Sequence, residues 1–170
     1  MVRLEDIVDK ISPSNPDTTI TLANLNNVSI IGLTIKGWFY GIYEYNSLYT
    51  IAESIITENT HGIVSQFSSP LITRNSITNN SGFGISNSTS SSSFIAENLI
   101  KGNGYDGIYT YASSPIIREN TVTMNGISNG MYDISSSTPN ISFNVYDTII
   151  GTTGVGQFNV KSDGSLAPAP

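Results

Sequence analysis

Two stretches of the chain, GIVSQFSSPLITRNSITNN (residues 62–80) and GIYTYASSPIIRENTVTMN (residues 107–125), follow the same plan. Each begins with Gly-Ile and continues through short apolar runs that are separated by Ser, Pro and Asn. Gly-Ile, or Gly followed by Met or Val, recurs at steps of 21, 22, 23, 23 and 24 residues. The glycines that mark these steps are Gly41, Gly62, Gly84, Gly107, Gly130 and Gly154. Recurrence at this period predicts a solenoid of stacked units.

A second mark, I-x-x-N-x-[IV]-x-x-N, runs in step with the first and is complete over residues 72–80, 95–103 and 117–125. The apolar runs alternate between inward and outward positions and are too short for a helix, which predicts three short strands in each unit. Leucine-rich repeats have a similar length, but this chain has 24 Ile and only 8 Leu. We therefore expect an all-β parallel solenoid of about six coils, each of 21–24 residues, stacked about 4.8 Å apart.

The recurring Asn and Gly residues each suggest a role in the turns. Asn tolerates a left-handed backbone, and its amide can hydrogen-bond to the Asn of the next coil, which would form an asparagine ladder. Gly ahead of the first strand of each coil offers the same backbone freedom.

The stretches at residues 62–80 and 107–125 resemble the right-handed parallel β-helix repeat of the pectate-lyase-like superfamily and of the periplasmic NosD-like proteins. The resemblance covers about residues 20–160 and implies this fold, with caps at the ends of the core. It also implies an extracellular, cell-surface or periplasmic location and a substrate groove along the first strand of each coil. Because the group includes lyases, hydrolases, epimerases and non-catalytic surface proteins, it does not define an activity.

The length of the chain predicts one domain. We expect residues 1–19 to form an N-terminal cap with a short helix, because four apolar residues from Leu4 to Ile11 lie on one helical face. We expect residues 20–160 to form the β-helix and residues 161–170 to form a flexible tail. The first residues carry acids and no apolar core, so we expect no secretory signal within the given sequence.

The composition excludes several classes of protein. The net charge is −6 and only 12% of residues are charged, which disfavours nucleic acids and anionic membranes as partners. No apolar run is long enough to span a membrane. The absence of Cys excludes disulfides, thiolate metal sites and a Cys nucleophile.

The residues that alternate with the inward Ile of the first strand are expected to face outward. They include the candidate ligand-binding residues Tyr43, Tyr45, Tyr109, Tyr111 and Tyr132. Exposed tyrosines offer flat apolar area with a polar tip, which suits sugar rings, although they also stabilise sheets by stacking across strands. We expect the residues between them, among them Glu44 and Asp133, to enter the turn, and His61 to be an exposed loop residue without a catalytic partner.

A second column before the turn Asn is charged. Arg74 is expected between Glu53 and Glu97 in an ion-pair ladder, while Glu97 and Glu119 face each other as like charges. Such a pair either raises one carboxyl pKa or binds Ca²⁺, unless a neighbouring Arg relieves the repulsion. We assign no catalytic residue and no metal site; the candidates for catalysis are Glu97, Arg118, Glu119 and Asp133.

These features leave three functions open. The first is a non-catalytic module that binds an extracellular or cell-surface polysaccharide through the tyrosines. The second is a polysaccharide lyase, hydrolase or epimerase, for which the acids are few. The third is a structural scaffold, or part of a larger surface protein, without a ligand. The open last coil, from Gly151 to Val160, ends in a sheet edge that a second copy can cover, so we also expect oligomerisation through this end.

Overall fold

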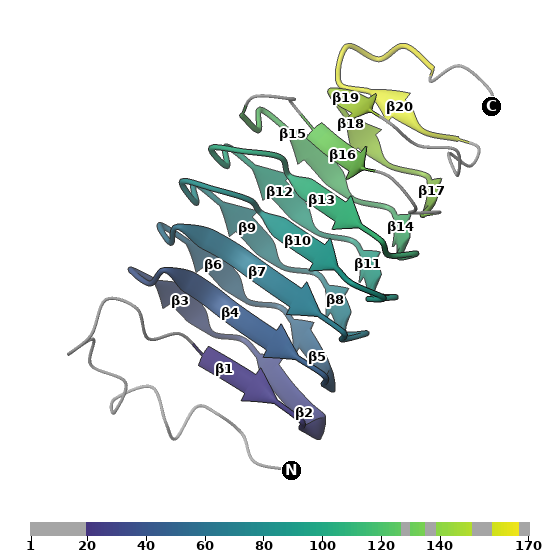
Figure 1. Cartoon of the computed structure of the whole chain (residues 1–170). Coiled ribbons are helices and arrows are strands. Elements are labelled where there is room, and N and C mark those ends of the chain that lie inside the picture. Colours follow the sequence, from purple (N-terminus) through teal and green to yellow (C-terminus); the bar gives the residue numbers. More distant parts are fainter. Residues whose placement is uncertain (1–19, 127–129, 135–138, 151–157, 167–170) are drawn as a thin grey trace.

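The structure is a computed structural model that describes residues 20–126, 130–134, 139–150 and 158–166. Within these residues the chain forms twenty strands and no helix, and the strands lie in three parallel sheets. Figure 1 shows the coils stacked along one axis, with β1 and β20 at opposite ends. The predicted all-β parallel solenoid is confirmed, whereas the predicted cap and helix over residues 1–19 lie outside the described residues.

Each sheet collects one strand from successive coils, and among the described residues the last coil contributes only to the first and third sheets. The first sheet contains β1 (Ile20–Ala23), β4 (Tyr40–Tyr45), β7 (His61–Gln66), β10 (Ile85–Ser88), β13 (Ile108–Tyr111), β16 (Gly130–Ile134) and β19 (Thr148–Ile150). The second contains β2 (Asn26–Ile31), β5 (Leu48–Ala52), β8 (Leu71–Thr73), β11 (Phe94–Ala96), β14 (Ile116–Arg118) and β17 (Asn140–Ser142). The third contains β3 (Thr34–Lys36), β6 (Ile55–Thr57), β9 (Ser76–Thr78), β12 (Leu99–Lys101), β15 (Thr121–Thr123), β18 (Val145–Tyr146) and β20 (Val160–Lys161).

The core is a stack of isoleucines. In the coil formed by β7, β8 and β9, the inward residues Ile63, Ile72 and Ile77 are fully buried. The equivalent residues of the next coil, Ile85, Ile95 and Ile100, pair with them in register. β-Branched side chains suit this pleated, buried surface, which explains why Ile outnumbers Leu.

The chain turns at three corners in each coil, and each corner uses a residue in the left-handed region. At the corner between the second and third sheets, Glu53, Arg74, Glu97 and Glu119 have φ between 54° and 59°. The predicted left-handed Asn is therefore wrong, because the left-handed residue immediately precedes it. The corner after β10 is longer than its neighbours and holds two consecutive left-handed residues, Thr89 and Ser90.

The Asn that follows each left-handed residue is buried and hydrogen-bonds from coil to coil. Asn98 Nδ2 donates to Asn120 Oδ1 (3.0 Å) and to the carbonyl of Ile72 (2.9 Å). Asn98 Oδ1 accepts from the backbone N–H and the Nδ2 of Asn75, at 2.9 and 3.0 Å. The row at this corner is Ser54, Asn75, Asn98, Asn120, Asn144 and Asn159. These bonds satisfy the buried backbone groups of the corner, which explains the Asn spacing in the sequence.

The Gly that precedes each inward Ile of the first sheet lets the neighbouring coil approach closely. It is not needed for a left-handed backbone. A Cβ on Gly84 would lie 2.5 Å from the carbonyl oxygen of Gly107 and 2.9 Å from Ile100 Cγ2. Its φ is not in the left-handed region, and the same holds for Gly41, Gly62 and Gly107. The predicted reason for these glycines is therefore wrong, because the neighbouring coil excludes a side chain there.

The residues between the tyrosines of the first sheet do not enter a turn. Glu44, Ser65 and Asn87 lie opposite one another inside continuous strands, and each is fully buried. Ser65 Oγ donates to Glu44 Oε2 at 2.7 Å, while Glu44 Oε1 has no hydrogen-bond donor among the described residues. Burial raises the pKa of Glu44 well above its usual value, and the Ser65 hydrogen bond only partly offsets this.

We expect the buried Glu44 to make the protein less stable as the pH rises. The folded state keeps the Glu44 proton above the pH at which the unfolded chain loses it, so the folded state binds more protons in that window. Below the usual Glu pKa, Glu44 makes its whole contribution to the free energy of unfolding. Between the usual pKa and the raised pKa, this contribution falls by up to about 1.4 kcal/mol per pH unit.

Urea unfolding of the wild type and of Glu44→Gln between pH 4 and pH 8 measures this effect. Glutamine cannot ionise, so the variant is expected to gain stability relative to the wild type as the pH rises. Parallel stability curves for the two proteins would contradict a buried, protonated Glu44.

The last coil differs from the predicted one. β19 pairs with β16, so that Thr148 lies opposite Gly130. The repeat predicted Gly154 at this place, and Gly154 is outside the described residues. Phe158 belongs to the corner between the second and third sheets, where its ring stacks on Phe143 at 5.0 Å. Beyond β20 the chain folds back, and Leu166 bridges to Val160. Oligomerisation through this end stays a prediction.

Candidate ligand-binding face

Stacked rings cover part of the outer face of the first sheet. Tyr40 stacks on His61 with ring centroids 5.6 Å apart, and His61 stacks on Phe83 at 5.5 Å. Phe83 then stacks on Tyr109 at 4.8 Å. Four successive coils thus contribute to one column of rings along the solenoid axis.

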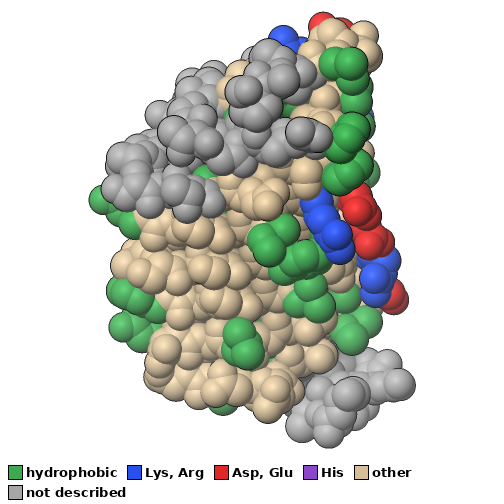
Figure 2. Space-filling model, turned by 90° about the vertical axis from the view of Figure 1, so that its right-hand side faces the viewer, with side chains coloured by type: hydrophobic (Ala, Val, Ile, Leu, Met, Phe, Trp, Pro, Cys, Tyr) green, Lys and Arg blue, Asp and Glu red, His purple; other side chains and the backbone are tan. Residues whose placement is uncertain are grey.

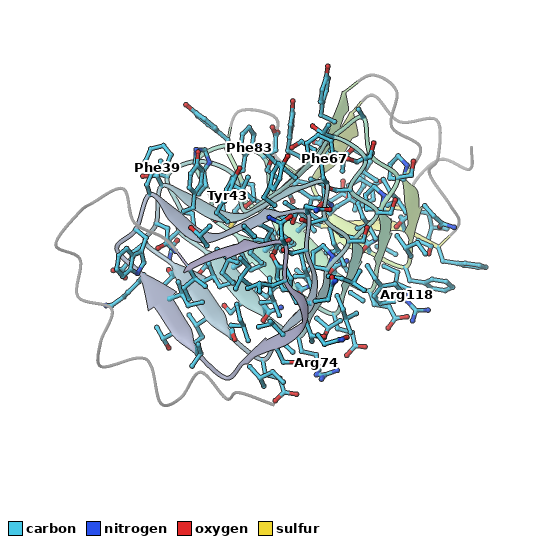
Figure 3. All side chains as sticks on the ribbon, turned by 60° about the horizontal axis from the view of Figure 1, so that its bottom comes forward. Phe39, Tyr43, Phe67, Arg74, Phe83 and Arg118 are labelled. Atoms are coloured by element: carbon cyan, nitrogen blue, oxygen red, sulfur yellow. The ribbon has the colours of Figure 1, made fainter. Side chains whose placement is uncertain are left out.

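Two further rings widen this column at its first coil. Phe39 packs edge-on against Tyr40. The ring centroids of Tyr43 and Tyr40 are 5.4 Å apart. Figure 3 shows Phe39, Tyr43 and Phe83 on the same side of the solenoid. We call this surface the aromatic strip and define it as Phe39, Tyr40, Tyr43, His61, Phe83 and Tyr109.

His61 is a half-buried member of the strip and not the exposed loop residue that the sequence predicted. It begins β7 and pairs with Tyr40 of the previous coil. The backbone N–H of Phe83 donates to His61 Nδ1 at 3.2 Å, which leaves the ring proton on Nε2. Burial lowers the pKa of His61, so the ring is neutral at neutral pH and adds no charge to the strip.

The structure divides the predicted tyrosines between two places. Tyr43 and Tyr109 are half-buried in the strip, and the Tyr43 hydroxyl donates to Gln66 Oε1 at 3.1 Å. Tyr45 and Tyr111 lie at the other end of their strands, with 43% and 45% of their surface exposed.

For Tyr132, the structure describes the backbone but not the side chain. The residue pairs with Tyr109 through β16. Sequence reasoning missed Tyr40, His61 and Phe83 as members of the site. Their signal is a common position, two residues before the inward Ile of each coil.

The charged residues at the corner between the second and third sheets lie on another side of the molecule from the strip. In Figure 3, Arg74 and Arg118 point away from the side that carries Phe39, Tyr43 and Phe83. Figure 2 shows that most Lys, Arg, Asp and Glu side chains visible on its face lie along the right-hand edge, with others at the top end.

The contacts of these charged residues are only partly those expected. Arg74 Nη2 lies 3.0 Å from Glu53 Oε1, and among the described residues Glu97 makes no ion pair. Arg118 lies over the ring of Phe94, at 4.9 Å from its centroid, and its Nε is 4.0 Å from Glu119 Oε1. Arg118 thus relieves the charge of Glu119 at long range.

The structure does not bring the four catalytic candidates together. Glu97, Arg118 and Glu119 lie at or next to the corner between the second and third sheets, whereas Asp133 lies on β16 of the first sheet, opposite Thr110. In the described part of the chain no group of three or more His, Asp or Glu residues is placed to hold a metal ion. Calcium binding by Glu97 and Glu119 stays a prediction. The described residues also include no helix long and apolar enough to cross a membrane.

The fold and this face together define a parallel β-solenoid with one aromatic side. A family model described as a right handed beta helix region matches residues 18–165, so the chain belongs to the right-handed β-helix family. Among curated proteins and among solved structures, no significant match to the chain was found.

Proposed function

We propose that the protein is a non-catalytic module that binds an extracellular or cell-surface polysaccharide along the aromatic strip. The observation that carries the proposal is the column of stacked rings from Tyr40 to Tyr109. At about 4.8 Å per coil, the column is about 14 Å long. Its rings stack on one another, so the exposed ring edges and tyrosine tips form a continuous surface along which several sugar residues can lie. The C–H groups of sugars can pack on the exposed apolar surface of these rings, and the polar tips of the tyrosines can hydrogen-bond to sugar hydroxyls.

The surroundings of the strip support a carbohydrate ligand. Many of the Ser and Asn residues are buried, but Thr60, Asn79 and Ser81 lie beside Phe39 and are not, so they offer neutral donors and acceptors next to the strip. The rings are held in place by their neighbours, so little side-chain freedom is lost on binding. An extracellular or periplasmic location follows as part of the proposal, since polysaccharides of this kind lie outside the cytoplasm.

Affinity electrophoresis against neutral and uronate polysaccharides, with and without calcium, tests the proposal. We expect one class of polymer to retard the wild type without release of product. Phe83→Ala and Tyr109→Ala each remove a ring from the column and are expected to weaken binding at least tenfold.

Phe143→Ala is the matched control, because it removes an exposed stacked ring from a different corner. Thermal unfolding of all variants separates lost binding from lost folding. Failure of every polymer to retard the wild type would contradict the proposal and favour a scaffold. Release of product would instead indicate an enzyme.

A further inference from the structure

A hollow lies next to the aromatic strip, at the corner between the third and first sheets. Its volume is about 420 Å³, which is within the range of small-molecule sites in proteins. The residues that shape it include Trp38, Phe39, Glu58, Thr60, Asn79 and Ser81. Phe39 belongs to both the hollow and the strip, so the two surfaces are continuous.

The walls of the hollow are fixed by bonds to the next coil. The N–H of Trp38 donates to Asn59 Oδ1 at 3.1 Å, and the N–H of Thr60 donates to the carbonyl of Trp38 at 2.8 Å. The carbonyl of Phe39 accepts from the N–H of His61 at 2.8 Å. The backbone that carries both rings is therefore in place before a ligand arrives.

The two sides of the hollow differ in chemistry. Trp38 and Phe39 give one side an aromatic surface. Glu58 and Asn79 give the other side polar groups, and they occupy the same left-handed position in successive coils. A carboxylate and an amide about one coil apart can hydrogen-bond to neighbouring hydroxyl groups of one sugar ring. Lys36 Nζ lies 3.8 Å from Glu58 Oε2, and both side chains are largely exposed.

We infer that this hollow holds the end residue of a neutral polysaccharide whose following residues lie along the aromatic strip, and that Glu58 selects against uronate sugars. The inference rests on the proposed function and assigns its ligand class. The carboxylate accepts hydrogen bonds from hydroxyls but repels a second carboxylate. Lys36 offsets part of this repulsion, since its Nζ lies 3.8 Å from Glu58 Oε2. The net charge of −6 adds to the same preference.

Isothermal titration tests the inference with β-1,4-linked glucan, mannan and galactan hexasaccharides and with the same compounds oxidised to carboxylates at C6. At least one neutral hexasaccharide is expected to bind the wild type tenfold or more tightly than its oxidised form. Glu58→Gln is expected to reduce that ratio to threefold or less. Trp38→Ala is expected to weaken binding of the neutral compound at least tenfold.

Glu97→Gln is the matched control, since it removes the same charge from a left-handed corner position away from the hollow. It should leave the ratio unchanged. Trp38 also packs against the core, so its variant is accepted only if it melts near the wild type, whereas Glu58→Gln changes an exposed side chain and keeps the test decisive.

The outcomes separate the inference from the proposed function. If Phe83→Ala abolishes binding while Glu58→Gln leaves the ratio unchanged, the strip binds the polymer and the hollow does not select it. Equal affinity of the wild type for neutral and oxidised compounds would likewise overturn the inference alone. If no hexasaccharide and no polymer binds, both the inference and the proposed function fail.

Discussion

Gly84→Ala is expected to destabilise the solenoid by about 3 kcal/mol or more, which combines overpacking with the loss of backbone hydrogen bonds. The new Cβ would lie 2.5 Å from the carbonyl oxygen of Gly107 and 2.9 Å from Asn103 Nδ2. That carbonyl cannot retreat freely because it accepts from the N–H of Ile85 at 2.8 Å. The strain therefore separates β10 from β13 in the middle of the first sheet.

Gly32→Ala is the control for this prediction. Gly32 has a φ of 71°, and a Cβ on it would meet nothing within 4 Å. The same corner position holds Glu53 and Arg74 in the next coils, so an L-residue is accepted there at a cost of about 1–2 kcal/mol. Urea unfolding followed by circular dichroism measures both variants. Equal losses of stability would show that the neighbouring coil yields to the new Cβ at little cost, which would contradict a requirement for close approach at Gly84.

Asn98→Ala is expected to lower the free energy of unfolding by about 3–5 kcal/mol, because several buried groups lose their partners together. Without the amide, the carbonyl of Ile72 loses a donor, and the N–H and Nδ2 of Asn75 lose their shared acceptor. Asn98 and Asn75 are almost fully buried, so water cannot replace these bonds.

Glu97→Ala gives the comparison for this prediction within the same turn. Glu97 is exposed and left-handed, and its side chain makes no ion pair among the described residues, so a change of about 0.5 kcal/mol or less is expected. Chemical denaturation of both variants at one pH measures the difference. A loss below about 1 kcal/mol for Asn98→Ala would contradict the prediction, because it would mean that the corner keeps its conformation without the hydrogen bonds of Asn98.

The repeat made the strands predictable because most strands of the second and third sheets carry one inward Ile three residues before an Asn, while Gly-Ile marks those of the first sheet. The corner residue was harder to place. Among residues with a side chain, Asn most readily adopts a left-handed backbone, yet Glu97 adopts it while Asn98 turns inward. The hydrogen bonds that the inward Asn makes to buried backbone groups outweigh the modest cost of a left-handed Glu. The relative size of these two energies cannot be judged from one sequence.

Glu44 shows a second limit of sequence reasoning. The cost of burying a carboxylate favoured a turn at this position, but strict alternation along β4 places the side chain inside the solenoid. Protonation and the hydrogen bond from Ser65 make that burial tolerable. The alternation pattern was the better guide here than the polarity of the residue.

The candidate site was predictable only where it lies on the strands themselves. Alternation identified Tyr43 and Tyr109, which lie on β4 and β13. Phe83 precedes β10, in a connection longer than the one before β7, so its place beside His61 depends on how that connection folds. The hollow beside Trp38 depends on the same connections, which the repeat does not describe.

The corners differ in how they tolerate changes in chain length. Between the second and third sheets, successive strands are always joined by the same short connection, such as Glu53-Ser54 or Glu97-Asn98. The variation in repeat length falls at the other two corners, where the extra residue at Thr89-Ser90 leaves Phe94 paired with Leu71. Insertions and deletions can therefore accumulate on two edges of the molecule without shifting the coils. New loops, and with them new specificities, can be added at these edges while the third edge preserves the architecture.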